Sequence, residues 1–233
     1  MHGKANSRRT SSVLSGARFI VVVIFAVIFH PSEARVEAKG NSGDGPKKGP
    51  LARFNGQQLE KLRAGEPVYE YKETSGEGES SAGYGQSSII IGAPIDRCFE
   101  LFSNLENQVH YVPGKIKSKI VSETGGKLLL ENELSFYGFT IKYYSIYTID
   151  KKNYRLAFEL DKSRPHDIDE MSGFHQFEKI DEKNTLYTYG VTKLDIGVSV
   201  PDFLKKYLLG RDLPAMAINV KKYIESNGQW RKE

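Results

Sequence analysis

Residues 199–228 read SVPDFLKKYLLGRDLPAMAINVKKYIESNG and predict a C-terminal helix on which the rest of the chain packs. Ser199, Pro201 and Asp202 mark a helix start, because a hydroxyl can cap free N–H groups, proline is tolerated in the first turn and an acid three residues on completes a capping box. Further along, apolar residues recur at helical spacing and form one stripe over about three turns. The stripe comprises Leu213, Met216, Ala217, Val220, Tyr223 and Ile224.

Gly210 divides this helical stretch into two expected parts. It predicts an interruption after a short first helix, and Asp212 with Pro214 predicts a second start. Asn227 and Gly228 predict the end of the second helix, because both residue types adopt the left-handed conformation common after a helix. A single apolar stripe needs an apolar surface to lie on, so we expect a sheet beneath it.

That apolar surface is supplied by the chain between Ile89 and Val198, where hydrophobic residues alternate with polar ones. Turn-forming sequences, such as Gly125-Gly126 and residues 151–153, separate the alternating runs. Each run has one apolar face, as an antiparallel sheet with one covered side requires. The clearest faces consist of Leu128, Leu130, Leu134 and Phe136, of Ile141, Tyr143, Tyr147 and Ile149, and of Leu156, Phe158 and Leu160.

Short elements are expected before this meander. Asn55 and Gln58 predict a capping box at the start of a short helix, and residues 68–72 read as a strand. The segment Gly76–Gly85 is rich in Gly and Ser, so we expect a hairpin loop there rather than a phosphate-binding loop, since a strand and not a helix follows.

The next strand is expected over residues 87–91. Ala93-Pro94 then opens an amphipathic helix, and a second short helix is expected over 104–110. The one cysteine of the chain, Cys98, falls on the apolar face of the first of these helices, which predicts buried packing. A single cysteine also excludes an internal disulfide and a metal site built from cysteines.

The N-terminal segment predicts export. Residues 1–18 are polar and basic, and Phe19–Phe29 is an unbroken apolar run that is short for a membrane span but suits the hydrophobic region of a signal peptide. Small-residue cleavage sequences follow, so the expected signal peptide is 1–34 or 1–38 and the protein periplasmic or secreted. Left uncleaved, the same segment would anchor the protein in the membrane and bring it into contact with the membrane surface.

Residues 35–53 are rich in Gly, Lys and Pro and predict a flexible linker, which places one domain at 54–233. Four of the 33 basic side chains but only one of the 29 acidic ones lie in residues 1–34, so the remainder is nearly neutral. This balance argues against nucleic acid as a partner, because a basic footprint is expected there. The oligomeric state is left open.

Several positions resemble the START-like or Bet v 1-like (SRPBCC) superfamily, which includes polyketide cyclase/dehydrase and coenzyme-Q-binding relatives. They are Ile91-Gly92-Ala93-Pro94-Ile95 with Phe99, Tyr111-Val112-Pro113 before a strand, Gly173 with Phe177, Thr185-Leu186-Tyr187, and Val200-Pro201 before the final helix. The resemblance covers about residues 65–226 and contains no catalytic signature. It implies an α+β helix-grip fold, in which a curved antiparallel sheet wraps around a long C-terminal helix and two short helices follow an early strand.

The resemblance further implies a hollow between sheet and helix that binds an apolar small molecule or lipid. Tyrosines among the strands suit such a cavity, because a buried hydroxyl supplies a polar point in an apolar wall. We expect no cofactor, no metal and no catalytic residue. The expected lining consists of Leu130, Leu134, Phe136, Tyr143, Tyr147, Phe158, His175, Phe177, Tyr189, Met216 and Val220.

Two alternatives to a carrier remain open. The first is a cyclase or dehydratase acting on an aromatic or polyketide-like substrate, for which His175 is the candidate base; many relatives carry tryptophan at this place, two residues after the glycine. The second is a ligand-free interaction module at the cell envelope. The polar cluster His166, Asp167, Asp169 and Glu170 lacks the spacing of a metal site and predicts a solvated loop.

Overall fold

The computed structural model describes residues 49–74, 82–136, 139–195 and 202–233, with side chains described for 49–70, 85–135, 140–195 and 210–233. The expected signal peptide therefore lies outside the described residues, as does most of the expected linker. The last four linker residues form a 3-10 helix, η1 (Pro50–Arg53). Arg53 donates hydrogen bonds to both carboxylate oxygens of Glu178, so the domain contacts the chain before residue 54.

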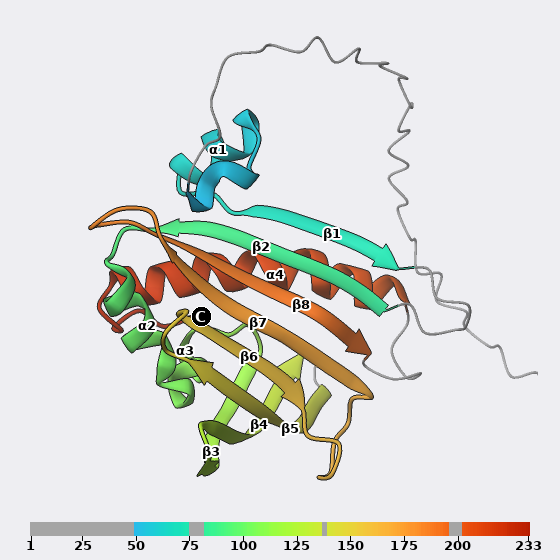
Figure 1. The fold of residues 1–233 in the computed structure, drawn as a ribbon. Coiled ribbons are helices and arrows are strands. Elements are labelled where there is room, and N and C mark those ends of the chain that lie inside the picture. Colours follow the sequence, from blue (N-terminus) through green and yellow to red (C-terminus); the bar gives the residue numbers. More distant parts are fainter. Residues whose placement is uncertain (1–48, 75–81, 137–138, 196–201) are drawn as a thin grey trace, which may run out of the picture. The chain divides into compact units, whose positions relative to one another are not determined.

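The main element is an eight-stranded sheet in which every neighbouring pair is antiparallel. Its spatial order is β1-β2-β8-β7-β6-β5-β4-β3, so β3 and β1 are the edges (Figure 1). The strands are β1 (Val68–Thr74), β2 (Ala82–Ile91), β3 (Lys115–Thr124), β4 (Lys127–Phe136), β5 (Phe139–Asp150), β6 (Arg155–Leu160), β7 (Glu170–Lys179) and β8 (Thr185–Asp195). The expected antiparallel meander is therefore confirmed.

Part of the expected hairpin loop Gly76–Gly85 is a strand instead. Residues from Ala82 belong to β2, where Gly83 pairs with Glu73 of β1, and Gly85 pairs with Tyr71 on one side and Val191 on the other. Glycine-rich sequence favours a turn locally, but here two neighbouring strands satisfy the backbone hydrogen bonds of these residues. Pairing with neighbouring strands thus overrides the local preference.

Short helices lie before and after the first two strands. The capping box of α1 (Gly56–Arg63) is confirmed: the Gln58 N–H donates to Asn55 Oδ1 and the Asn55 N–H to Gln58 Oε1, both at 2.9 Å. After β2 come α2 (Ile95–Ser103), η2 (Leu105–Asn107) and α3 (Gln108–Tyr111). Among the helices that the structure describes, none is both long and apolar enough to cross a membrane.

The C-terminal helix α4 (Asp202–Glu225) is continuous, so the expected interruption at Gly210 is wrong. Glycine and proline inside a helix cost about 1 and 3 kcal/mol, respectively. Burial of each large side chain of the stripe stabilises the fold by about 1.5–3 kcal/mol. All six stripe residues are at most 3 % exposed. Packing on the sheet therefore outweighs both helix breakers. The predicted end is confirmed, since Asn227 and Gly228 have positive φ and the Gly228 N–H donates to the Tyr223 carbonyl at 2.8 Å.

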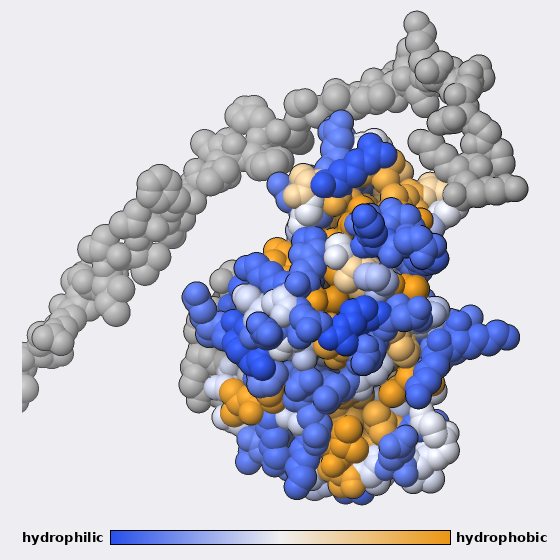
Figure 2. All heavy atoms as spheres, turned by 90° about the vertical axis from the view of Figure 1, so that its left-hand side faces the viewer, coloured by the Kyte–Doolittle hydropathy of each residue, from blue (hydrophilic) through white to orange (hydrophobic). Residues whose placement is uncertain are grey.

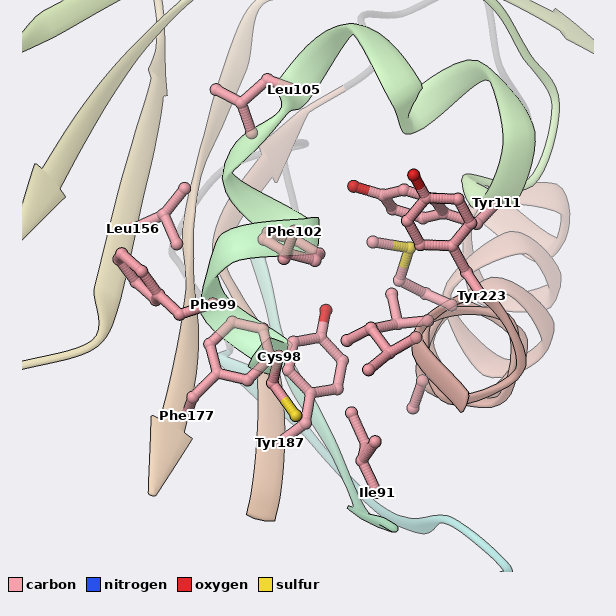
Figure 3. Packing of buried hydrophobic residues seen from close by; sticks show 14 of the residues in the cluster. Ile91, Cys98, Phe99, Phe102, Leu105, Tyr111, Leu156, Phe177, Tyr187 and Tyr223 are labelled. Carbon is pink, nitrogen blue, oxygen red and sulfur yellow. The ribbon is translucent and has the colours of Figure 1, made fainter. Parts of the chain in front are cut away.

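The core lies between one face of the sheet, α2 and the C-terminal part of α4 (Figure 3). Phe102 of α2 is at its centre, with ring centroids 4.6 Å from His175, 5.3 Å from Phe177 and 5.8 Å from Tyr187. Cys98 is fully buried beside it, as predicted. α2 thus fills one end of the space between sheet and helix with aromatic rings.

Candidate functional site: an apolar cavity beneath the C-terminal helix

A cavity of about 160 Å³ lies between the sheet and the described N-terminal part of α4. Five strands, β4 to β8, contribute to its wall, α4 contributes three residues, and the segment between α3 and β3 closes one side. The lining residues are Val112, Pro113, Leu134, Ile141, Tyr143, Phe158, Ile168, Met171, Tyr189, Val191, Leu194, Asp212, Leu213 and Met216. Most of these side chains are apolar, so the cavity suits an apolar ligand.

The predicted lining residues divide into two groups. Leu134, Tyr143, Phe158, Tyr189 and Met216 line the cavity. A second group does not line it and belongs to the core around Phe102: Leu130, Tyr147, His175, Phe177 and Val220. The side chain of Phe136 lies outside the described ones. The division follows from α2, which occupies the space beneath one end of α4 and leaves the other end hollow.

Several lining residues were not among those expected. Val112 and Pro113 precede β3, and Ile168 precedes β7, so neither segment belongs to a periodic pattern from which its direction could be inferred. Ile141 and Leu213 did carry a signal, because each shares a predicted apolar face with an expected lining residue. Met171 also alternates in step with His175 along β7.

Three lining residues bring polar groups. Tyr143 and Tyr189 each present a phenol, and neither hydroxyl forms a hydrogen bond with a described residue. Burial raises the pKa of both phenols, so they are neutral donors at physiological pH. The Asp212 carboxylate accepts a hydrogen bond from Arg211 Nε at 2.6 Å and is paired with that guanidinium. The two phenols are the polar points that a ligand would meet.

A buried cation lies next to the cavity. Lys115, the first residue of β3, is only 4 % exposed, and its Nζ donates to Gln108 Oε1 at 2.7 Å and to Asn132 Oδ1 at 2.8 Å. Nζ also lies 5.9 Å from the centre of the Tyr143 ring. Burial lowers the pKa of Lys115 to about 7, and the nearby Lys232 ammonium contributes in the same direction.

The two amides are oriented by their own hydrogen bonds. Gln108 Nε2 donates to the Tyr147 hydroxyl at 3.1 Å, and Asn132 Nδ2 donates to Ser145 Oγ at 2.9 Å. Because the amide N–H groups are used in this way, both amide oxygens face Lys115. The two amide oxygens therefore hold the Lys115 amine in place. No carboxylate of a described residue contacts this amine.

The chain matches no protein-family profile and no functionally curated sequence. Among solved structures, the Zhui aromatase/cyclase from Streptomyces sp. R1128 aligns with a TM-score of 0.52 and 16 % identity over 68 % of this chain and 94 % of that one. A START superfamily protein from Mycobacterium smegmatis aligns with a TM-score of 0.53 and 12 % identity, over 61 % and 97 %. This chain has a START-like fold.

A third START-like structure is the STAR-related lipid transfer protein of Xanthomonas axonopodis, fragment 25–204. Its TM-score is 0.51 at 13 % identity, and the alignment covers 69 % of this chain and 93 % of that one. Identities this low establish the fold and not the activity. The expected α+β helix-grip architecture is thereby confirmed, and the function has to be argued from the cavity.

His175 of β7 lies two residues after Gly173 in this START-like domain. It is 2 % exposed, and its Nδ1 lies 2.9 Å from the Tyr187 hydroxyl. Burial lowers its pKa to about 3, so the imidazole is neutral at physiological pH. It lies behind the cavity wall, where the Phe158 ring packs on it at 5.4 Å.

Gly173, two residues before this histidine, lies where no side chain fits. A Cβ there would lie 2.4 Å from Phe158 Cζ and 2.3 Å from the Gly190 carbonyl oxygen. Any other residue would displace the Phe158 ring, which lines the cavity. The glycine of the family resemblance therefore shapes the START-like cavity rather than a turn.

The polar cluster after residue 165 lies in and beside the segment that connects β6 and β7. The Asp167 carboxylate accepts from the Lys142 N–H at 2.8 Å, and Glu170 pairs with Lys162 at 2.5 Å. Both interactions are exposed, which fits the expected solvated loop. In the described part of the chain, no three His, Cys, Asp or Glu side chains gather in a way that could hold a metal ion.

Proposed function

We propose that this protein is a carrier that binds a hydrophobic small molecule or lipid in the cavity beneath α4. The observation that carries the proposal is the wall of this cavity, in which apolar side chains predominate and two phenols that form no hydrogen bond with a described residue supply polar points. A cavity of about 160 Å³ is close to the size that encloses one benzene ring in an engineered protein. Burying a chain of about seven carbons contributes roughly 5–6 kcal/mol before binding costs, at about 0.8 kcal/mol per methylene.

The lining favours a carrier over a cyclase or dehydratase. Proton transfer would need an acid and a base facing the substrate with pKa values near the working pH. The phenols have raised pKa values, and Asp212 is paired with Arg211. His175, the candidate base, is not among the lining residues and bonds to Tyr187 instead. An enzyme therefore has little support from this wall.

A ligand-free interaction module has less support as well. That function predicts a filled interior and a large exposed apolar patch. The interior contains the cavity, and on the face drawn in Figure 2 hydrophobic residues form separate groups among hydrophilic ones. Export by a signal peptide at 1–34 or 1–38, into the periplasm or the medium, is part of the proposal and rests on the sequence of that segment.

Filling the cavity tests this function. Val191 of β8 lines the cavity and is 5 % exposed, so Val191→Phe places a ring in the ligand's space. The matched control is Val121→Phe, because Val121 on β3 is 44 % exposed. Titration calorimetry with 1-octanol is expected to show one site in the wild type and in Val121→Phe, and at least about tenfold weaker binding in Val191→Phe. Equal binding by all three proteins, or none by the wild type, would contradict the proposal.

A further inference from the structure

Lys115 is a buried amine with no acidic side chain in contact with it among the described residues. Its ammonium has three N–H donors, of which two go to the amide oxygens of Gln108 and Asn132, and no described group accepts the third. A buried charge is expensive unless it is paired. Two neutral amides satisfy hydrogen bonds but leave the charge itself uncompensated. An anion is the missing partner.

A ligand bound in the cavity would bring such an anion close to Lys115. Lys115 pairs in the sheet with Leu134, and Val112 and Pro113 lie just before it in the chain; all three line the cavity. Its Nζ lies 5.9 Å from the centre of the Tyr143 ring, and Tyr143 lines the cavity; no described residue forms a hydrogen bond with the Tyr143 hydroxyl. Tyr143 is therefore both a neighbour of the Lys115 side chain and part of the wall of the ligand space, and the stem of a lysine is flexible enough to reorient toward that wall.

We propose that the ligand is an amphiphile with a single carboxylate, and that Lys115 binds this group while the apolar chain or ring of the ligand fills the cavity. Tyr143 supplies a second donor to the carboxylate. This inference rests on the proposed function and adds the chemical class of the ligand. The size of the cavity points to a compact acid, with about one aromatic ring or a chain of about seven carbons inside.

Pairing a ligand carboxylate with Lys115 costs less desolvation than pairing two fully hydrated ions. Folding has buried Lys115, so the ligand loses only the hydration of its own carboxylate, and a charge-assisted hydrogen bond then forms in an apolar setting. A neutral alcohol of equal length obtains no such pairing. The acid should therefore bind about tenfold to a hundredfold more tightly than the alcohol while Lys115 is protonated.

The groups around Lys115 fix the pH at which this preference appears. The phenols of Tyr143 and Tyr147 have raised pKa values and His175 a pKa lowered to about 3, so all three stay neutral between pH 6 and 8. Lys232, which donates to the Lys115 carbonyl, has a pKa lowered to about 8 and is the one other neighbour that titrates in this range. Among the described groups around Lys115, these two lysines are therefore the ones that can take up a proton at pH 7 to 8 when the acid binds.

The direct test compares octanoate with 1-octanol on the full chain at pH 6. Lys115→Met keeps the length of the side chain and removes the charge, and Lys119→Met, exposed on the same strand, is the matched control. The wild type and Lys119→Met should prefer octanoate by about tenfold or more. Lys115→Met should lose octanoate binding by at least about tenfold and keep octanol binding within about twofold.

The same experiment separates the role of Lys115 from the carrier function. Unchanged octanoate affinity in Lys115→Met, with octanol still bound, would overturn the role of Lys115 and leave the carrier function standing. Failure of both ligands to bind the wild type would contradict the carrier function itself. Should Lys115→Met not fold, Lys115→Gln replaces it, since the glutamine amide can still donate to one of the two amide oxygens.

A second measurement needs no Lys115 variant. At pH 8 most Lys115 side chains are neutral, so octanoate binding should take up close to one proton, measured as the dependence of the calorimetric heat on buffer ionisation enthalpy. Octanol should take up none. Lys232→Met should reduce the uptake without abolishing it, because the pKa of Lys115 rises when the neighbouring charge is removed, while the proton still goes to Lys115. Octanoate binding without proton uptake, or uptake that disappears in Lys232→Met, would overturn the assignment.

Discussion

His175 is held as a neutral imidazole within a cage of rings. The rings of Phe102, Phe158 and Tyr189 lie 4.6, 5.4 and 4.9 Å from it, and the Tyr187 hydroxyl bonds to Nδ1. The imidazolium would lose most of its hydration there, which is why its pKa falls from the ordinary 6.5 to about 3. This histidine therefore links the stability of the core to pH.

Because of this linkage, the free energy of unfolding should decrease as the pH falls. Below pH 6.5 the unfolded chain protonates this histidine, whereas the folded protein does so only near pH 3, so stability is lost as pH falls between these values. The contribution is about 1.4 kcal/mol per pH unit. The free energy of unfolding, measured by urea titration, should therefore decrease less steeply with falling pH in His175→Phe than in the wild type. The two slopes should differ by about 1.4 kcal/mol per pH unit.

The exposed His166 supplies the control for this measurement. His166→Phe should reproduce the wild-type dependence on pH, because its side chain is exposed in the segment between β6 and β7. The lowered pKa of His110 acts in the same direction but is present in all three proteins and cancels from the comparison. An identical slope for His175→Phe and the wild type would show that His175 is not buried as described.

Lys115 shows what sequence reasoning could not provide at the level of single residues. Alternation along β3 places Lys115, Lys117 and Lys119 on one face, which is the usual pattern of a solvated strand. The pairing with β4 shifts by one residue between Lys115 and Lys117. Lys115 consequently points inward while Ile116, its neighbour, is 56 % exposed. Side-chain direction after such a bulge is not encoded in the local pattern.

At the scale of elements, α4 was predictable in its packing but not in its continuity. The apolar stripe from Leu213 to Ile224 has a period that only one face of a helix produces, and all of its residues are buried. A glycine such as Gly210 occurs both where a helix ends and inside a continuous helix, so the local sequence does not distinguish the two. The decision depends on contacts with the sheet, which lie far away in the sequence. The β2 glycines were misread for the same reason.

Gly210 therefore provides a prediction about stability. The helix runs through it, and a Cβ added there would meet nothing within 4 Å. Gly210→Ala should raise the free energy of unfolding by about 0.5–1 kcal/mol, because alanine restricts the unfolded chain and suits the helix. The matched change Gly126→Ala, at φ +75° in the β3–β4 turn, should instead destabilise the protein. A loss of stability in Gly210→Ala would contradict a continuous helix.

At the scale of the whole domain, the division of the space beneath α4 determines what the protein can bind. Aromatic residues of α2 and α3 fill one end, and the other end remains hollow between Leu134, Tyr189 and Met216. The sequence predicted that the sheet would pack on this helix, since both have one apolar face, and the family resemblance implied a hollow between them. The sequence could not predict which half α2 occupies, because that depends on the orientation of a short helix against two distant elements. Five of the eleven expected lining residues consequently belong to the filled half.

The most direct test of the central claim is native mass spectrometry of the full chain purified from its own cells, followed by organic extraction of what travels with it. We predict one hydrophobic small molecule or lipid per chain, with or without a polar head group, absent from Val191→Phe prepared in the same way and retained by Val121→Phe. An apo mass for the wild type, together with no rise in its melting temperature on adding octanol or octanoate, would contradict a carrier with a cavity beneath α4.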